Sequence, residues 1–397
     1  METSLYVRLS FLQFLQFFIW GSWFVTAGTY LLETLQFSGR EVGMVYGTTA
    51  IAATLSPFLL GLLADRYFSS EKLLSVLHFL GGGLLFYLSK VDHFSLFYPV
   101  MLLYVLCFLP TFSLAHGLCL HHITDTNKDF PKVRVWGTIS WILAGLLISW
   151  LKVEKEVLPL EIAAGFSILQ GVYCLTLPKT PPSPQEGKNF FQSLFDPEIR
   201  ALFKDRSFVV MIVALTLICI PSSYYYSFVN PFLNEMGVTN AAGKMAIGQV
   251  TEIVLMLALP FFLLRFSFRN ILFIGLLSWG IRYGVFIIGI EWNSELLYMI
   301  GIALHGVAFV FAMFSAQIYM DKKVPTHLRN TAQGFYTLLT LGFGVFIGSY
   351  IAGETVSIYT FDSNLHDWAA IWLLPAVIGV VVALGFWRLF GSGKMEA

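Results

Sequence analysis

Charge is scarce in this chain, in which Asp, Glu, Lys and Arg make up only 12% of the 397 residues. Soluble globular domains contain about 25% charged residues, so a soluble fold of ordinary composition is excluded. Hydrophobic residues account for 57% of the chain, and phenylalanine alone occupies 38 positions. Such a composition favours a protein that lies in a lipid bilayer.

Cysteine is also rare, with four residues in the whole chain. All four lie inside apolar stretches or at their edges, where cysteine behaves as a small buried hydrophobe. The sequence therefore predicts neither a disulfide framework nor a metal site, and no cofactor is expected. These residues are Cys107, Cys119, Cys174 and Cys219.

Enzyme motifs are missing as well. The chain contains no H-E-x-x-H, no G-x-S-x-G and no pair of acids that face each other in adjacent apolar stretches, so we do not expect an intramembrane enzyme. The start, METSLYVRLSFLQF, has no charged region followed by a small-residue cleavage site. The first apolar run is therefore expected to be a mature helix and not a removed signal peptide.

Apolar runs of roughly 20 residues recur along the chain, each long enough to cross a hydrocarbon core about 30 Å thick. Backbone groups in lipid must be satisfied internally, which favours a helical bundle. The prediction is an all-α integral membrane protein with twelve transmembrane helices. The predicted spans are 8–32, 42–64, 71–90, 95–120, 131–151, 159–178, 207–234, 242–264, 269–290, 296–319, 329–352 and 367–390.

Basic residues set the expected orientation, because cytoplasmic loops retain Lys and Arg. With both termini in the cytoplasm, 18 of the 24 basic residues fall on inside segments, five fall outside, and Arg282 lies within the ninth span. Residues 179–206 form a polar connection that divides six spans from six. We expect an N-terminal six-helix bundle over 1–178, this cytoplasmic linker, and a C-terminal bundle over 207–397. Within the linker, PEIRALFK is either a short interfacial helix or part of a plain connection.

Two six-helix bundles around a central cytoplasmic loop resemble the layout of the major facilitator superfamily, whose halves rock about a midplane site. The segment GLLADRY, which follows the second span, resembles the superfamily's G-x-L-A-D-R gating motif. Gly61 would permit close helix approach, Asp65 would sit at a helix N-terminus, and Arg66 would bond exposed carbonyls or a facing acid. The alternative for Asp65 is an ordinary surface loop.

Within that superfamily the chain resembles the bacterial nucleoside:proton symporters over most of its length. The most specific of the matching segments is DFPKVRVWGTISW, which begins at Asp129. The others are FLQFFIWGSWFVTAGTY from Phe14, VGMVYGTTAIAA from Val42, GQVTE from Gly248, ALPFFLLRF from Ala258, GVAF from Gly306 and TAQGF from Thr331.

The DFPKVRVWGTISW segment is expected to begin a helix, with Asp129 as its cap and Pro131 in its first turn. Arg134, Thr138 and Trp141 then share one helical face. They offer hydrogen-bond donors, a hydroxyl and a stacking ring, which suit a polar aromatic ligand. The alternatives are that Arg134 extends to water at the cytoplasmic end and that Trp141 serves only for packing.

Glu252 is the most informative single residue, because it lies in the apolar stretch AIGQVTEIVLMLALPFFLL. A carboxylate in hydrocarbon costs at least ~2.5 kcal/mol, so intramembrane acids usually mark a substrate or proton path. Gln249 lies three residues earlier on the same face, and an amide beside a carboxylate can bind ribose hydroxyls. The alternative is a glutamate that pairs with another helix only for packing.

The resemblance implies that Gln249 and Glu252 line the nucleoside cavity and that Glu252 couples transport to protons. Relatives commonly have Gln, Asn, Tyr and Asp at four positions where this chain differs, which puts the nucleoside preference in question. By alignment, the remaining cavity positions are Ser223 and Tyr226 on the seventh span and His305 and Phe309 on the tenth. The four differing positions are Ser223, Tyr226, His305 and Val310.

Two histidines inside predicted spans, His116 and His305, have side chains that titrate near neutral pH. Each is either a proton-transfer group or a neutral histidine bonded to a carbonyl. Arg282, inside the ninth span, needs a partner or a water-filled crevice, and the sequence does not name that partner.

Together with the resemblance, the sequence predicts a proton-coupled nucleoside importer of the inner membrane that works by alternating access and catalyses no covalent chemistry. The expected partners are a nucleoside, a proton and the lipid bilayer; no nucleic acid is expected, and the protein is expected to be monomeric. The alternatives are a major facilitator carrier of another polar solute, such as a sugar or a modified nucleoside, and a receptor that binds its ligand without moving it.

Overall fold

The computed structural model describes every residue except 1, 64–67, 182–201, 326–327, 362–364 and 392–397. Helices form nearly all of the regular structure in the described part, and no strand longer than a single bridge occurs there. The chain divides into two compact units. The first comprises Met1–Glu186 with Thr239–Gly243, and the second comprises Gly187–Val238 with Lys244–Ala397.

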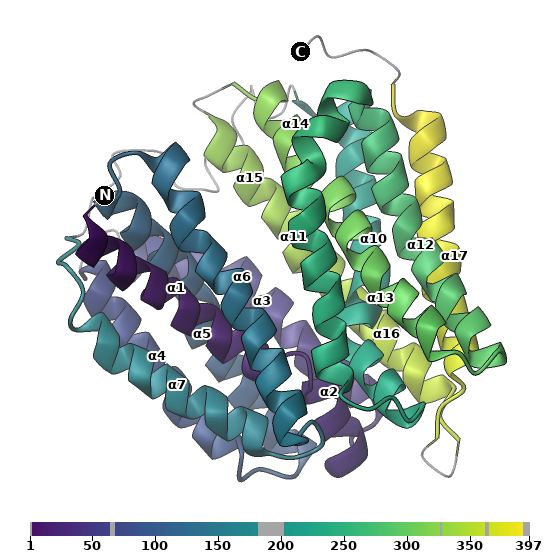
Figure 1. The fold of residues 1–397 in the computed structure, drawn as a ribbon, viewed down its shortest axis with the longest axis horizontal. Helices are drawn as coiled ribbons and strands as arrows, with labels where there is room; N and C mark the ends of the chain where they lie inside the picture. The colour runs from purple at the N-terminus through teal and green to yellow at the C-terminus, as the bar shows by residue number, and fades with distance from the viewer. Residues whose placement is uncertain (1, 64–67, 182–201, 326–327, 362–364, 392–397) are drawn as a thin grey trace. The chain divides into compact units, whose positions relative to one another are not determined.

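The first unit consists of helices at the first six predicted spans (Figure 1). Its first span is interrupted after Trp23 and continues as a short helix and a π-helical turn. The elements are α1 (Thr3–Trp23), α2 (Ala27–Thr29), η1 (Tyr30–Thr34), α3 (Gly39–Leu63), α4 (Ser70–Leu88), α5 (Phe94–His122), α6 (Thr126–Leu151) and α7 (Leu158–Cys174).

Helix α6 begins earlier than the sequence predicts. Asp125 caps it, since its carboxylate accepts a hydrogen bond from the Lys128 amide at 3.1 Å. The predicted cap, Asp129, is wrong, because this residue already lies in the first turn and pairs with Lys132 at 3.1 Å. Pro131 consequently lies inside the helix and not at its start.

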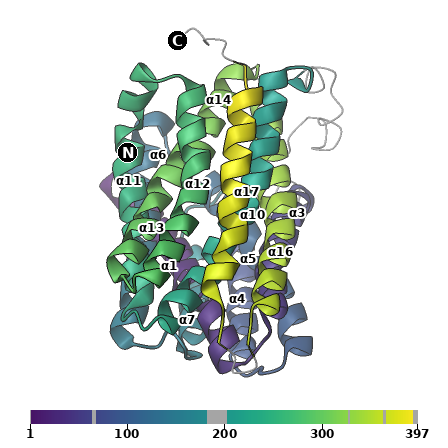
Figure 2. The same ribbon diagram turned by 90° about the vertical axis from the view of Figure 1, so that its right-hand side faces the viewer.

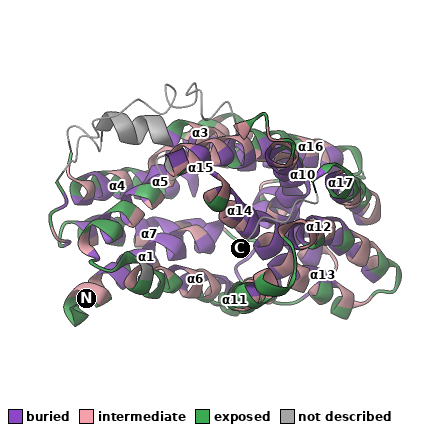
Figure 3. Cartoon of the chain, turned by 90° about the horizontal axis from the view of Figure 1, so that it is seen from above, coloured by how far each residue is buried: buried purple, intermediate pink, exposed green. Residues whose placement is uncertain are grey.

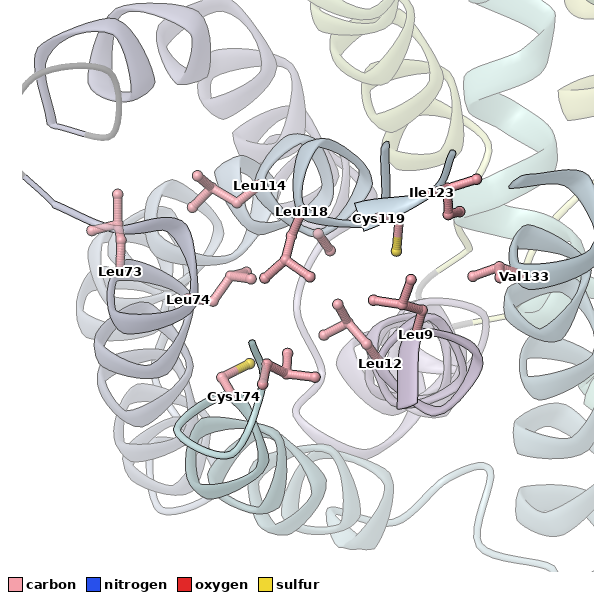
Figure 4. Close-up of a cluster of buried hydrophobic side chains, with 12 residues drawn as sticks. Leu9, Leu12, Leu73, Leu74, Leu114, Leu118, Cys119, Ile123, Val133 and Cys174 are labelled. Atoms are coloured by element: carbon pink, nitrogen blue, oxygen red, sulfur yellow. The ribbon is translucent and has the colours of Figure 1, made fainter. Parts of the chain in front are cut away.

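The core of the first unit is aliphatic at one end of the bundle. Figure 4 shows Leu9 and Leu12 of α1 near Leu118 of α5, with Leu74 of α4 and Cys174 of α7 in the same cluster. All of these side chains are buried. Tight packing of such apolar side chains fixes how α1 lies against its neighbours.

A second part of this core is polar, and its central residue is His78 of α4, which is 1% exposed. The two ring nitrogens lie 3.2 Å from the Ser167 hydroxyl and 3.1 Å from Gln16 Oε1. Gln16 also donates to Thr111 at 2.7 Å and accepts from Gln170 at 2.9 Å. These neutral hydrogen bonds connect α1, α4, α5 and α7, and the sequence analysis did not anticipate them.

The segment Thr239–Gly243 belongs to the first unit, and hydrogen bonds explain why. Both carboxylate oxygens of Glu154, which is buried, accept from the Ala242 amide at 3.0 and 3.1 Å. The Ser149 hydroxyl accepts from the Gly243 amide at 2.7 Å and donates to Glu154 at 2.6 Å. Glu154 therefore satisfies amides that would otherwise lack partners at the start of a helix.

The second unit consists of helices at the last six predicted spans, and Figure 2 shows α17 lying along α12 and α10. Its elements are α10 (Arg206–Glu235), α11 (Ala241–Arg265), α12 (Phe268–Glu291), α13 (Glu295–Ala308), η2 (Phe309–Phe314), α14 (Ser315–Lys323), α15 (Arg329–Thr337), η4 (Leu338–Gly344), α16 (Val345–Ile358) and α17 (Trp368–Leu389).

Two of these spans contain a π-helical turn, as the first span does. In η2 the wide turn leaves the Val310 carbonyl to accept from the Ser315 hydroxyl at 3.0 Å. In η4 the Thr340 hydroxyl donates to the Tyr336 carbonyl at 2.7 Å. Wide turns of this kind concentrate at functional sites, and η2 begins at the predicted site residue Phe309, one turn after His305.

Many outward positions are apolar, and Figure 3 shows exposed residues on the outer faces of α11 and α13. On α11, Leu257 and Leu264 are 79% and 87% exposed. Among the residues that the structure describes, ten helical segments are long and apolar enough to cross a membrane, and α7 is a shorter apolar helix. Exposed leucines on such helices are explained by contact with lipid.

Parts of two predictions lie outside the described residues. Gly61 is in α3, but Asp65 and Arg66 of the predicted gating motif are among residues 64–67, which the structure does not describe. The same holds for most of the predicted linker, including 182–201 and thus the first part of PEIRALFK.

Candidate functional site

Arg134 on α6 is half-buried, and its guanidinium lies over the ring of Phe17 on α1, 4.0 Å from the ring centroid. Gly137, one turn on, is closely approached by the same two side chains: a Cβ there would lie 2.6 Å from Phe17 and 2.9 Å from Arg134 Nη1. A larger residue at Gly137 would therefore displace the Phe17 ring or the Arg134 guanidinium where α6 meets α1. Arg134 is held by an aromatic face instead of extending freely to water, which favours its predicted role over the alternative.

Trp141 belongs to an aromatic wall in the first unit. Its ring meets Trp20 edge-on at 5.2 Å and lies 6.2 Å from Phe24. Trp20 in turn contacts Phe112 of α5 at 4.9 Å, and its indole nitrogen is buried without a partner in the described part of the chain. Trp141 and Thr138 are both half-buried. The wall offers ring faces and one unused N–H donor, as a base-binding surface requires.

His116 of α5 lies beside this wall. Its ring is 6.5 Å from Phe17 and 5.8 Å from Phe130, and its Nε2 atom is buried without a partner among the described residues. Arg134 interacts with it electrostatically. A nearby cation opposes a second positive charge, so this position does not favour His116 as a proton carrier.

In the second unit His305 of α13 is the centre of the candidate site and is 1% exposed. Its ring stacks on Tyr225 at 4.8 Å with an interplanar angle of 13°, and Tyr226 meets it edge-on at 5.9 Å. Phe309 lies 5.8 Å away. Two predicted residues, Tyr226 and Phe309, are therefore brought together around His305.

Glu252 of α11 faces the same histidine, with 3.7 Å between its Oε2 atom and His305 Nε2. The Glu252 side chain is 20% exposed, so that the carboxylate is shielded but still accessible. Gly306 makes this approach possible, since a Cβ at that position would lie 2.6 Å from the Glu252 backbone nitrogen. Gln249, one turn earlier, is half-buried. The predicted polar face of α11 thus lies next to the predicted histidine of α13.

Arg282 of α12 completes this cluster, and the sequence had left its partner open. The side chain is 0% exposed, its Nε donates to the Gly301 carbonyl at 3.2 Å, and its guanidinium lies 3.8 Å from the centroid of Tyr225. Nη1 lies 3.5 Å from His305 Nδ1. A basic residue in the middle of an apolar span was the available signal, but helical spacing does not show which other helix it meets.

Two of the four positions that we expect to differ from the relatives, Ser223 and Val310, face away from His305. The Ser223 hydroxyl donates to the Cys219 carbonyl of its own helix at 2.9 Å and lies against Gly348 of α16. Val310 is 0% exposed in an aliphatic cluster with Leu259 and Ile271. Substrate contact by Ser223 stays a prediction, and Val310 serves packing in this arrangement.

The comparisons with known proteins identify the family of this chain. The family model described as "Nucleoside H+ symporter" matches residues 1–394. The putative nucleoside transporter YegT of Escherichia coli is 39% identical over 98% of this chain and 94% of its own length, and the xanthosine permease of Escherichia coli is 31% identical over 96% and 95%.

A crystal structure of the nucleoside transporter NupG superimposes with a TM-score of 0.89 at 30% identity, covering 98% of this chain and 100% of that one. The predicted all-α membrane fold of major facilitator type is confirmed, and none of these relatives is an enzyme. The chain belongs to the nucleoside H+ symporter family.

Proposed function

We propose that this protein takes up nucleosides together with protons across the inner membrane and that Glu252 is the proton-coupling residue. The contact between Glu252 and His305 carries the proposal, because it places a shielded acid beside a polar aromatic cluster in a membrane-spanning helix. Protonation neutralises a buried carboxylate and changes its hydrogen bonding. Proton and nucleoside occupancy can therefore jointly bias an alternating-access equilibrium.

Each unit carries one set of candidate substrate contacts. In the first unit these are Arg134, Thr138 and Trp141 of α6, supported by the aromatic wall around Trp20. A ring face suits the base, and a guanidinium or hydroxyl suits polar groups of the base or ribose. In the second unit they are Ser223, Tyr226, Gln249, Glu252, His305 and Phe309.

The decisive experiment compares Glu252→Gln with wild type in proteoliposomes. Glutamine mimics the protonated acid, so the variant should exchange labelled for unlabelled uridine across the membrane but should not accumulate it under an inward proton gradient. Glu295→Gln is the matched control, because Glu295 is an exposed acid that pairs with Lys244 at the start of α13. Wild-type accumulation by Glu252→Gln would show that another group couples transport to protons.

The substrate class rests on family membership and on the aromatic character of both sets of contacts. One relative is a xanthosine permease, so purine nucleosides belong in the test beside pyrimidine nucleosides. Ligands that bind the folded state raise its thermal stability by mass action. A thermal-shift panel of nucleosides, free bases and sugars should show stabilisation by nucleosides; stabilisation by sugars alone would favour the other polar-solute carrier.

We also propose that both termini are cytoplasmic and that the transporter functions as a monomer. The orientation rests on the excess of basic residues in the loops expected on the inside. Accessibility of a cysteine introduced at Ser69, between α3 and α4, to an impermeant thiol reagent in whole cells tests it, and no labelling is expected. Labelling from outside would reverse the orientation.

A further inference from the structure

Arg282 is the one fully buried cation described in this structure, and the proposed function gives it no role. Its Nη2 atom has no hydrogen-bond partner in the described part of the chain, and its guanidinium covers the ring of Tyr225. An unused guanidinium donor favours an acceptor or a negative charge nearby. A buried cation without a counter-charge is also strongly destabilising.

The contact between Arg282 and His305 fixes where the histidine carries its proton. A guanidinium can only donate hydrogen bonds, so His305 Nδ1, 3.5 Å from Arg282 Nη1, must be the acceptor. A neutral imidazole then has its single proton on Nε2. That nitrogen faces Glu252 Oε2 at 3.7 Å, which gives the order Arg282, His305, Glu252 across three helices.

This order has a consequence for the proton. A second proton on His305 would have to bind at Nδ1, which the guanidinium occupies, and would place two positive charges side by side. The groups around Glu252 are His305 of α13, whose Nε2 atom faces it, and the phenols of Tyr225 and Tyr226 of α10, which interact with it electrostatically; Arg282 of α12 lies on the other side of His305. Among the described groups of this cluster, the Glu252 carboxylate is therefore the site that remains for the transported proton.

We propose that Arg282 is a positioning residue for proton coupling: it is the fixed counter-charge of deprotonated Glu252, it acts through neutral His305, and it keeps the transported proton off His305. The inference rests on the proposed coupling role of Glu252. Arg282 touches neither substrate nor proton in this scheme. Its charge balances the cluster when Glu252 is deprotonated and leaves a net positive charge when Glu252 is protonated.

The first test measures stability and does not depend on transport. Arg282→Gln and Glu252→Gln each leave one charge without its partner, so each should lower the apparent melting temperature in detergent at pH 8. The double variant removes both charges and should recover much of that loss, as coupled residues do in a double-mutant cycle. Arg265→Gln, which removes an exposed cation lying 4.5 Å over Phe261, should show no such coupling to Glu252→Gln. Strict additivity for Arg282 would overturn the proposal.

The second test measures the pH profile of uridine exchange with equal pH on both sides. Removal of the counter-charge favours the protonated acid, so Arg282→Gln should move the half-maximal pH upward by at least one unit. Arg282→Lys keeps the charge but loses the planar fork, and it should stay closer to wild type. An unchanged profile in folded Arg282→Gln would assign Arg282 to packing alone. If Glu252→Gln itself accumulates substrate normally, the proposed coupling role of Glu252 is wrong. The double-mutant stability cycle would still show whether Arg282 and Glu252 form a charge pair.

Discussion

Each unit buries a histidine among polar groups, but the two surroundings differ in charge. His78 in the first unit has both ring nitrogens bonded to neutral partners, Ser167 and Gln16. His305 in the second unit lies between a cation and an acid, with unused donors nearby. A fully bonded neutral network serves to fix helix packing. A charged cluster with a titratable acid can respond to proton binding, so the charge balance and not the histidine distinguishes the two roles.

The largest effect is expected when a carboxylate is placed in the second unit without Arg282 as its counter-charge. Val310→Asp buries an acid in an aliphatic cluster, where an uncompensated charge costs about 3 kcal/mol or more. We expect a large loss of thermal stability and little folded protein. Val310→Ala is the control, since it leaves only a cavity. Equal stability of the two variants would mean that a donor or water reaches position 310 and that a carboxylate is readily accommodated there.

His78→Ala tests whether the first cluster is purely structural. Loss of the ring leaves Gln16 and Ser167 with unsatisfied atoms, at about 1–3 kcal/mol for a buried group. Stability should fall by about 2 kcal/mol, while the pH profile of uridine exchange should match wild type. His93→Ala, at an exposed loop histidine, should change neither property. A shifted pH profile in His78→Ala would make His78 part of proton coupling.

Arg134→Ala tests the cation of the first unit, which lies half-buried over Phe17 and is not enclosed as Arg282 is. If its guanidinium bonds the nucleoside, affinity should fall by at least ~1.5 kcal/mol, the value of a hydrogen bond to a charged group. Arg134→Lys should restore only part of the lost affinity, because lysine has no planar guanidinium. Equilibrium binding of labelled uridine measures both, with Lys132→Ala as the control. Unchanged affinity would place Arg134 outside the binding site.

The smallest effect is expected at a partly exposed ion pair of the second unit, Asp205 with Lys323 at 2.7 Å. Partial burial raises the pKa of Asp205, but hydrogen bonds from Lys323 and the Phe208 amide outweigh it and leave the pKa below its ordinary value. An acid whose pKa is lowered in the folded protein stabilises the fold at pH values above its unfolded pKa, which is near 4. This stabilisation is lost as the pH falls through the folded pKa.

Asp205→Asn keeps a capping side chain for α10 but removes the charge, so it should cost only about 0.5 kcal/mol at pH 7. The difference from wild type in melting temperature should shrink as the pH falls below 4. A difference that is as large at pH 3 as at pH 7 would assign the effect to the cap and not to the ion pair.

The sequence predicted the spans well because hydrophobic length identifies a membrane helix directly. It also predicted that Glu252 and His305 belong to one site. It did not predict the contact of Arg282 with His305, the His78 network or the packing of Ser223 against α16, because these depend on how neighbouring helices are rotated about their axes. Helix α12 is apolar on nearly every side, so its sequence contains little information on that rotation. The early start of α6 was missed because Asp125 and Asp129 are both good caps.

The wide turn Phe309–Phe314 has a consequence for how this family can change over time. A π-turn contains one residue more than an α-turn, and one residue corresponds to about 100° around a helix. Loss of a single codon within this turn would convert it to an α-turn and leave both His305 and the later side chains of the span, up to Lys323, on their present faces. The same loss in a regular α-helix would rotate every later side chain, so a wide turn is a place where the chain can gain or lose one amino acid without exchanging the set of residues that the helix presents.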